Sequence, residues 1–196
     1  MNFLAHAYLS FYQKEILVGN MISDFLKGKS QYAFSPGIQK GIRLHRFIDD
    51  YTDTHPLIKQ AKEVFRPDYR LYSGPIVDIL LDHFLATDPD HFNPAALQIF
   101  TQYTYNTLEE YAPHLPLRFV LVLAYMKQEN WLLNYQYKEG IEKSLRGLVR
   151  RSAFLSDSTR AIELFNEHYD YLKKLSSLFA RDVKINAKDQ LTNLSN

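Results

Sequence analysis

Cysteine is absent from the 196-residue sequence, which excludes disulfide bonds and thiolate metal ligands. The longest uninterrupted apolar run, Phe119 to Met126, is far too short to cross a bilayer. The formal net charge is +1, so the molecule as a whole is not a strongly basic nucleic-acid binder, and any electrostatic recognition must come from a local patch. The first residues lack a basic segment and are not typical of a signal peptide. We therefore expect a cytoplasmic protein with neither a membrane nor a nucleic-acid partner.

Motifs for covalent catalysis are also missing. The sequence has no glycine-rich phosphate loop and no Gly-x-Ser-x-Gly motif, so nothing supports acyl transfer through a nucleophilic serine. The Glu-x-x-His pairs of ferritin-like di-metal bundles are absent as well, because Glu129 is not followed by such a histidine. A redox di-metal protein is therefore disfavoured.

Helical periodicity runs through most of the chain, and no stretch alternates convincingly with the period of two that a strand needs. We predict an all-α, single-domain multi-helix bundle of roughly eight to nine helices, because prolines and glycines break the pattern about that often. The helical domain is expected over 1–183, followed by a polar tail over 184–196 that frays. The expected helices span residues 2–12, 15–28, 37–51, 56–65, 71–87, 94–110, 116–134, 137–150 and 157–180, the last capped by Ser156 or Asp157.

Acidic and histidine side chains recur four residues apart within apolar, helix-like segments. Residues at this spacing share one helix face, so His45 points the same way as Asp49, and Asn20 the same way as Asp24. Imidazole with carboxylate suits Mn, Fe or Mg, and for His45 and Asp49 we prefer a metal site to a structural hydrogen bond. For Asp24, a metal ligand and a buried ion pair with a basic residue such as Arg43 stay equally open.

The sharpest cluster is formed by Asp78, Asp82 and His83 in an otherwise apolar segment. Asp78 and Asp82 stand one helical turn apart, and two close carboxylates repel unless one is protonated or a cation lies between them. Burying them without neutralisation is costly. We favour a bound cation; the alternative is neutralisation by arginines from elsewhere, for which the candidates are Arg43, Arg46 and Arg118.

Other residues are weaker candidates on their own. His6 lies in an apolar segment, where a core histidine bonded to a backbone carbonyl is the simpler explanation unless other ligands gather around it. Asp53 and His55 lie near the start of a predicted helix, where a capping role is the simpler explanation for both. Arg46 and Asp50 are four apart and typical of a surface salt bridge, which contributes little stability.

A basic ridge runs along the predicted helix over 137–150. Spacings of three and four place Lys143, Arg146 and Arg150 on one face, with Arg151 next to them. A solvated face is the usual explanation of such a ridge. A docking strip for an acidic partner, or a set of phosphate-binding arginines, is the functional alternative.

Taken together, these segments resemble the acyl carrier protein phosphodiesterase family, also called acyl carrier protein hydrolyases. The resemblance covers nearly the whole chain, and its specificity lies in the combined spacing of the motifs. It extends more loosely through residues 130–132 and 147–151. Its main motifs are Met1-Asn2-Phe3-Leu4-Ala5-His6, Gly19-Asn20-Met21-Ile22-Ser23-Asp24-Phe25, the segment from Gly41 to Pro56, and Tyr72 to Ala86 with Val77-Asp78-Ile79-Leu80-Leu81-Asp82-His83-Phe84 at its centre.

The resemblance implies a fold, a cofactor and a reaction. Members of this family resemble remote relatives of the HD phosphohydrolases, which implies an HD-like helical fold and a divalent metal, typically Mn²⁺, with Mg²⁺ or Fe²⁺ as alternatives. The implied reaction removes 4′-phosphopantetheine from holo-acyl carrier protein and gives the apo protein, within fatty acid and lipid metabolism. The substrate would be the main partner, and the oligomeric state stays open.

The resemblance also implies roles for individual residues. It suggests metal ligands at His6, Asp24, His45, Asp49, Asp82 and His83. The catalytic residues would be His83, Asp82 and His6. Residues supporting the ligands or contacting substrate would be Asn20, Asp78, Asp53, Arg43 and Arg46, and the acidic carrier protein would dock on Lys143, Arg146 and Arg150. The order Asp82-His83 departs from the His-then-Asp order of the wider HD pattern, which leaves the individual ligands and the number of metals open.

Two other functions stay open at this stage. The same metal site would serve an HD-like phosphohydrolase that acts on a nucleotide or another small phosphoester. A helical binding protein whose core ion pairs are purely structural would need neither metal nor substrate. Of the three possible functions, we expect the carrier-protein phosphodiesterase.

Overall fold

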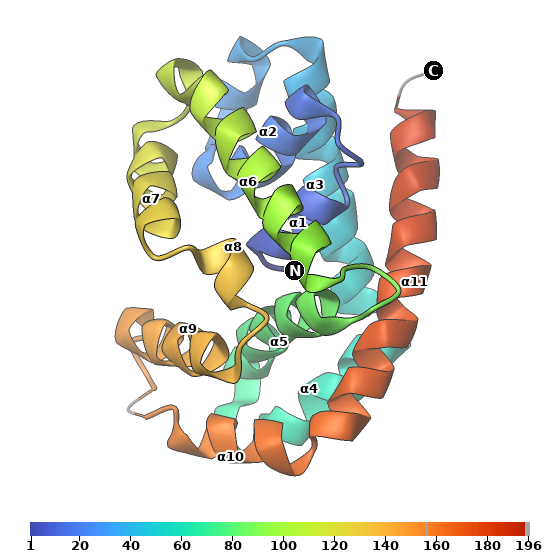
Figure 1. Ribbon diagram of the computed structural model, residues 1–196, viewed down its shortest axis with the longest axis vertical. Helices are drawn as coiled ribbons and strands as arrows, with labels where there is room; N and C mark the ends of the chain where they lie inside the picture. Colours follow the sequence, from blue (N-terminus) through green and yellow to red (C-terminus); the bar gives the residue numbers. More distant parts are fainter. Residues whose placement is uncertain (156, 195–196) are drawn as a thin grey trace.

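Eleven α-helices form the regular structure of the chain in the computed structural model, which describes residues 1–155 and 157–194 (Figure 1). No strand occurs in these ranges, so the predicted all-α class is confirmed. The helices are α1 (Phe3–Tyr8), α2 (Lys14–Ile22), α3 (Pro36–Thr54), α4 (Pro56–Tyr69), α5 (Ser73–Thr87), α6 (Pro94–Tyr111), α7 (Leu117–Gln128), α8 (Trp131–Asn134), α9 (Lys138–Arg151), α10 (Thr159–Glu167) and α11 (Tyr169–Asn193). Short 3₁₀ turns lie at Ser23–Phe25, Gly28–Ala33, Arg70–Tyr72 and Ala112–His114. None of the helices described is both long and apolar enough to cross a bilayer.

Proline and polar caps set the starts of the longer helices. Ser35 accepts a hydrogen bond from the Ile38 amide at the start of α3, and Asn93 accepts one from the Ala96 amide at the start of α6. A proline occupies the next position in both helices, where its missing N–H costs nothing. The breaks predicted from these prolines are therefore where the helices begin.

Two predicted helices are each divided in two. The helix expected over 116–134 ends at Gln128 and resumes at Trp131, because Asn130 takes a left-handed backbone conformation with φ of 46°. Asparagine is among the few residues that adopt this conformation. The helix expected over 157–180 is divided at His168 between α10 and α11. Of its two expected caps, Ser156 lies outside the described residues. Asp157 is not at the cap position, because α10 begins at Thr159 and Ser158 is the residue before it.

Two helices run further than predicted. Pro67 does not end α4, which continues to Tyr69 although the proline removes one backbone hydrogen bond. The tail expected to fray from residue 184 continues α11 as far as Asn193. Ala187 and Leu191 lie one helical turn apart and are buried, so this segment carries an apolar face. The helix packs along α3, α4 and α5 (Figure 1).

Helices α2 and α3 cross in backbone contact at a pair of glycines. A Cβ on Gly19 would lie 2.0 Å from the Ile38 carbonyl oxygen, and one on Gly41 would lie 2.3 Å from the Ile16 carbonyl oxygen. Only glycine fits such a close approach. The crossing brings Asn20, next to Gly19, against His45, one turn beyond Gly41. This close crossing therefore positions Asn20 and His45, two residues of the polar cluster described next.

Candidate metal centre

Three side chains from α1 and α3 converge on one point. His6, His45 and Asp49 each offer a ligand atom, and these atoms all lie within 4.8 Å of one another. The Nε2 atom of His6 is 3.2 Å from Oδ1 of Asp49, and the Nε2 atom of His45 is 3.0 Å from Oδ2 of the same carboxylate. The two imidazole rings are stacked, with centroids 4.1 Å apart. Of the residues predicted from the sequence, these three form the central group.

Asp24 lies at the edge of this group. Its Oδ1 is 3.0 Å from Nε2 of His45, so the carboxylate pairs with the histidine and not with Arg43. The side chain of Asp24 is 77% exposed, whereas those of His6 and His45 are 4% and 6% exposed. The group is therefore buried on the imidazole side and open to solvent on the Asp24 side.

Asn20 fixes the orientation of both imidazoles. Its side-chain Nδ2 donates to the His6 carbonyl oxygen and to Ser10 Oγ, which leaves Oδ1 as the acceptor 2.8 Å from His6 Nδ1. Its backbone carbonyl oxygen lies 2.7 Å from His45 Nδ1. Both partners of the Nδ1 atoms are acceptors, so each Nδ1 carries the proton and donates. When neutral, each ring therefore presents an unprotonated Nε2 to Asp49.

The group's charges are strongly coupled. Burial and, to a smaller extent, the neighbouring His45 lower the pKa of His6 to about 4, against the opposing effect of Asp49. Burial also lowers the pKa of His45, but hydrogen bonds with Asp24 and Asp49 outweigh it and raise that pKa to about 9. Burial would raise the pKa of Asp49, yet the hydrogen bond with His45 and the nearby His6 and Met1 ammonium hold it well below its usual range. The carboxylate is therefore ionised at neutral pH.

An orphaned atom tests whether these residues fit a cation. His6 Nε2 is buried and has no hydrogen-bond partner among the described residues, although Asp49 Oδ1 is only 3.2 Å away. An imidazole lone pair and a carboxylate oxygen repel at this distance unless a cation or proton lies between them. Two imidazole nitrogens and carboxylate oxygens form a donor set that suits Mn²⁺, Fe²⁺ or Zn²⁺. Each nitrogen's ring is also held through its Nδ1–H, as in most metal-binding histidines. The residues fit a divalent metal.

The terminal ammonium of Met1 also reaches this carboxylate. Its nitrogen lies 3.1 Å from Asp49 Oδ1 and 3.4 Å from Asp78 Oδ1. Burial lowers the pKa of this ammonium, but Asp78 and Asp49 outweigh it, so the pKa is raised. Asp78 thus faces the Met1 ammonium next to the candidate metal group of His6, His45 and Asp49, but it is not a member of that group.

Asp82 and His83, expected to be ligands, are not brought to this group. Both carboxylate oxygens of Asp82 accept backbone hydrogen bonds at the start of α1, from the Leu4 amide at 2.9 Å and the Ala5 amide at 3.0 Å. His83 points elsewhere, with Nδ1 2.7 Å from the Tyr135 carbonyl oxygen and Nε2 2.9 Å from the Tyr169 hydroxyl. Asp78 and Asp82 thus have different partners, the Met1 ammonium and the start of α1, and their pairing around one cation stays a prediction. Asp82 instead anchors α1, the helix that carries His6.

The remaining predicted residues lie apart from one another. Asp53 forms a surface ion pair with Lys62 at 2.7 Å. Arg43 and Arg46 are exposed on α3, the helix that carries His45 and Asp49. The basic ridge of α9 is divided: Lys143 pairs with Glu129 and Arg146 with Glu142, whereas Arg150 and Arg151 line a pocket together with Lys143.

Sequence reasoning missed Ser10. Its hydroxyl donates to the His6 carbonyl oxygen at 2.8 Å and accepts from Asn20, so it helps to hold the amide that orients His6. Nothing in the sequence separates Ser10 from an ordinary serine at the end of a short helix. Only the close approach of α1 and α2 gives it this contact.

Comparisons with known proteins give one consistent result. The family model described as acyl carrier protein phosphodiesterase matches residues 1–183. A protein of that name from Yersinia pestis is 37% identical over 180 residues, covering 91% of this chain and 93% of the relative. Proteins of the same name from Photorhabdus laumondii and Escherichia coli are 34% and 33% identical, covering 86% and 88% of this chain and 86% and 90% of the relatives. No solved structure matches the chain significantly, so the HD-like fold stays a prediction.

Proposed function

The chain belongs to the acyl carrier protein phosphodiesterase family, and we propose that it hydrolyses the phosphodiester between 4′-phosphopantetheine and the serine of holo-acyl carrier protein. The family supplies the substrate in this proposal. His6, His45 and Asp49 supply the site, with a divalent metal held between them and Asp24 at its exposed edge.

The observation that carries the proposal is the shared orientation of the two histidines. Both use Nδ1–H on an oxygen of Asn20, and both turn Nε2 towards Asp49. A purely structural pair would gain more from a hydrogen bond at each nitrogen, because an unsatisfied buried nitrogen is costly. The unpartnered Nε2 of His6 beside the Asp49 carboxylate is instead an arrangement that a bound cation would complete.

The proposed reaction is the hydrolysis of one phosphorus–oxygen bond. Water adds its oxygen to phosphorus, the bond from phosphorus to the serine oxygen breaks, and the serine oxygen takes up a proton. A divalent ion in this group would lower the pKa of a coordinated water and screen the negative phosphodiester. Asp24 lies on the solvent side next to His45, and the His45 hydrogen bond lowers its pKa. It is therefore ionised at neutral pH and placed to accept a proton from water entering there.

We propose Mn²⁺ as the metal, because two imidazoles with carboxylates suit it and the substrate is a phosphodiester; Mg²⁺ and Fe²⁺ are the alternatives. We propose that the acidic carrier protein approaches the exposed edge of the group. Arg43 and Arg46 are exposed on α3 and would meet its negative charge.

The test is the conversion of holo- to apo-acyl carrier protein, followed by mass spectrometry. Chelator-treated enzyme should be inactive, and added Mn²⁺ should restore conversion. His45→Gln should remove it, whereas His114→Gln, at an exposed histidine outside the group, should retain it. Cleavage of bis(p-nitrophenyl) phosphate without any conversion of holo-acyl carrier protein would contradict the proposed substrate.

A further inference from the structure

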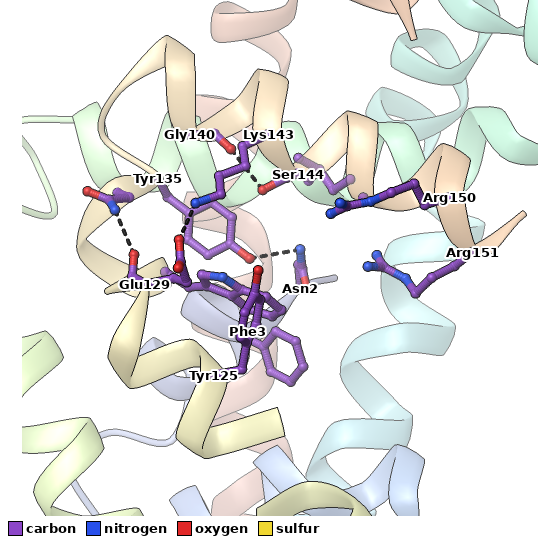
Figure 2. A pocket seen from close by; sticks show the side chains of 14 residues that line it. Asn2, Phe3, Tyr125, Glu129, Tyr135, Gly140, Lys143, Ser144, Arg150 and Arg151 are labelled. Atoms are coloured by element: carbon purple, nitrogen blue, oxygen red, sulfur yellow. Dashed lines mark hydrogen bonds and ion pairs between the residues drawn. The ribbon is translucent and has the colours of Figure 1, made fainter. Parts of the chain in front are cut away.

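A second polar site lies beside the candidate metal group. A pocket of about 240 Å³ opens between the start of α1 and helices α7, α8 and α9. Its walls include the aromatic rings of Phe3, Tyr125 and Trp131. Figure 2 shows Arg150 and Arg151 extending from α9 towards Asn2 at one end of the pocket. The pocket therefore joins an aromatic wall to a cationic end.

Arg150 and Arg151 both bring their guanidinium groups to Gly147. Arg151 Nη1 is 3.2 Å, and Arg150 Nη2 is 4.0 Å, from the point where a Cβ on Gly147 would lie. Gly147 thus leaves the space into which both guanidinium groups turn. No ion pair to either group occurs within residues 1–155 and 157–194, although Lys143 and Arg146 on the same helix are both paired. Two adjacent cations without a carboxylate favour an anion that bridges them.

The other polar groups of this pocket suit a phosphate ester. Tyr135 accepts a hydrogen bond from Asn2 Nδ2, and burial raises its pKa well above the usual value, so its hydroxyl keeps a proton to donate. Glu129, an acidic residue of the lining, is paired with Lys143. The unpaired charge of the lining is therefore positive and lies at the arginine end.

The pocket adjoins the metal group through consecutive residues. The Met1 nitrogen contacts Asp49, and Asn2, the next residue, lines the pocket. Neighbouring Cα atoms are about 3.8 Å apart, so the first two residues of the chain link the pocket to the candidate metal group. A pocket of this volume is at the small end of ligand sites and holds a phosphate with a short adjoining segment.

We infer that this pocket binds the phosphate end of 4′-phosphopantetheine, with Arg150 and Arg151 on the phosphate oxygens and the neighbouring dimethyl segment against Phe3 and Trp131. The inference rests on the proposed function for the identity of the ligand. It makes Arg150 and Arg151 substrate-positioning residues, and it makes the pocket the place from which the phosphomonoester product leaves.

Trp131 gives a direct measurement of occupancy, because it is the sole tryptophan of the chain and lines the pocket. The full-length protein, treated with chelator, is titrated with 4′-phosphopantetheine, pantetheine and inorganic phosphate, and both fluorescence and heat are recorded. We expect saturable binding of 4′-phosphopantetheine at least about tenfold tighter than that of pantetheine or phosphate alone. Arg150→Gln with Arg151→Gln should remove this advantage while leaving pantetheine binding unchanged. Arg146→Gln, on the exposed side of α9, is the matched control and should bind as the wild type.

Several results would overturn the inference. Equal affinity for 4′-phosphopantetheine and pantetheine would show that the arginines do not contribute to binding. Equal affinity for 4′-phosphopantetheine and inorganic phosphate would show that the aromatic wall does not contribute. Phosphodiesterase activity of the same protein preparations, measured after Mn²⁺ has been added back, separates the two proposals. Active protein with neither a fluorescence change nor heat would overturn the pocket and leave the proposed function standing. Binding without any release from holo-acyl carrier protein would do the reverse.

Discussion

His6 Nε2 lies 3.2 Å from Asp49 Oδ1, and within the described residues it has no hydrogen-bond partner. The other nitrogen of His6 is held by Asn20 Oδ1 at 2.8 Å, so the ring cannot turn to relieve the contact without losing that bond. A lone pair and a carboxylate held together in this way are stabilised by a cation. The relationship explains why a polar group persists between α1 and α3 in an otherwise apolar core.

Asn20→Ala should weaken Mn²⁺ binding about 10- to 100-fold, because it removes the acceptor that orients His6 while leaving every proposed ligand in place. Calorimetric titration of the chelated protein with Mn²⁺ measures the effect. Ser10→Ala is the control, since it removes the neighbouring hydroxyl and keeps the bond between Asn20 and His6. If Ser10→Ala lost as much Mn²⁺ affinity as Asn20→Ala, a general loosening of the local structure would be responsible, and not the orientation of His6.

Asp82→Asn should lower the free energy of unfolding by about 1–3 kcal/mol. Both Asp82 oxygens accept backbone N–H groups, from Leu4 and Ala5, and an asparagine offers only one oxygen to these two donors. Urea unfolding in the presence of chelator measures the change without any metal contribution. Asp53→Asn, which breaks only a surface ion pair with Lys62, should stay within about 0.5 kcal/mol of the wild type. An unchanged Asp82→Asn protein would contradict the anchoring role.

His83 should make the fold sensitive to acid. Burial lowers its pKa, against the opposing hydrogen bond to the Tyr135 carbonyl. As the pH falls below about 6.5, the ordinary histidine value, the unfolded chain takes up a proton that the folded chain refuses, so stability falls. The stability advantage of the wild type over His83→Gln should therefore shrink between about pH 7 and pH 5. Urea unfolding at each pH tests this, with His114→Gln as the control for removing one imidazole; a constant advantage would be the contrary result.

Gly41→Ala should destabilise the protein by about 1–3 kcal/mol, because the added Cβ would lie 2.3 Å from the Ile16 carbonyl oxygen and force α2 and α3 apart. Mn²⁺ binding should weaken in the same variant, since the helix crossing positions His45 against Asn20. Gly74→Ala is the control: its Cβ would meet only the flexible end of Lys62, at 3.6 Å. Thermal unfolding of both variants compares them, and equal melting temperatures would contradict the close-contact argument.

The pairing of His45 with Asp49 was predictable because a spacing of four residues fixes a shared helix face whatever the rest of the fold does. The same rule placed Asp78 with Asp82, but spacing does not reveal which helix will meet a face. There the start of α1 brings two amides to Asp82 and removes it from the metal group. Asn130 gives a similar lesson, because hydrophobic periodicity continues across a residue whose left-handed backbone divides the helix. Local pattern determined the elements and faces; their partners depend on tertiary packing.

The most direct test of the central claim is the Mn²⁺ dependence of 4′-phosphopantetheine release from holo-acyl carrier protein by Asp49→Asn and Asp50→Asn. Asp49 belongs to the group with His6 and His45, whereas Asp50, the next residue, is exposed outside it. The account predicts that Asp50→Asn responds to Mn²⁺ as the wild type does. It predicts that Asp49→Asn is inactive or needs at least about tenfold more Mn²⁺. Wild-type release by Asp49→Asn at the same Mn²⁺ concentration would contradict it.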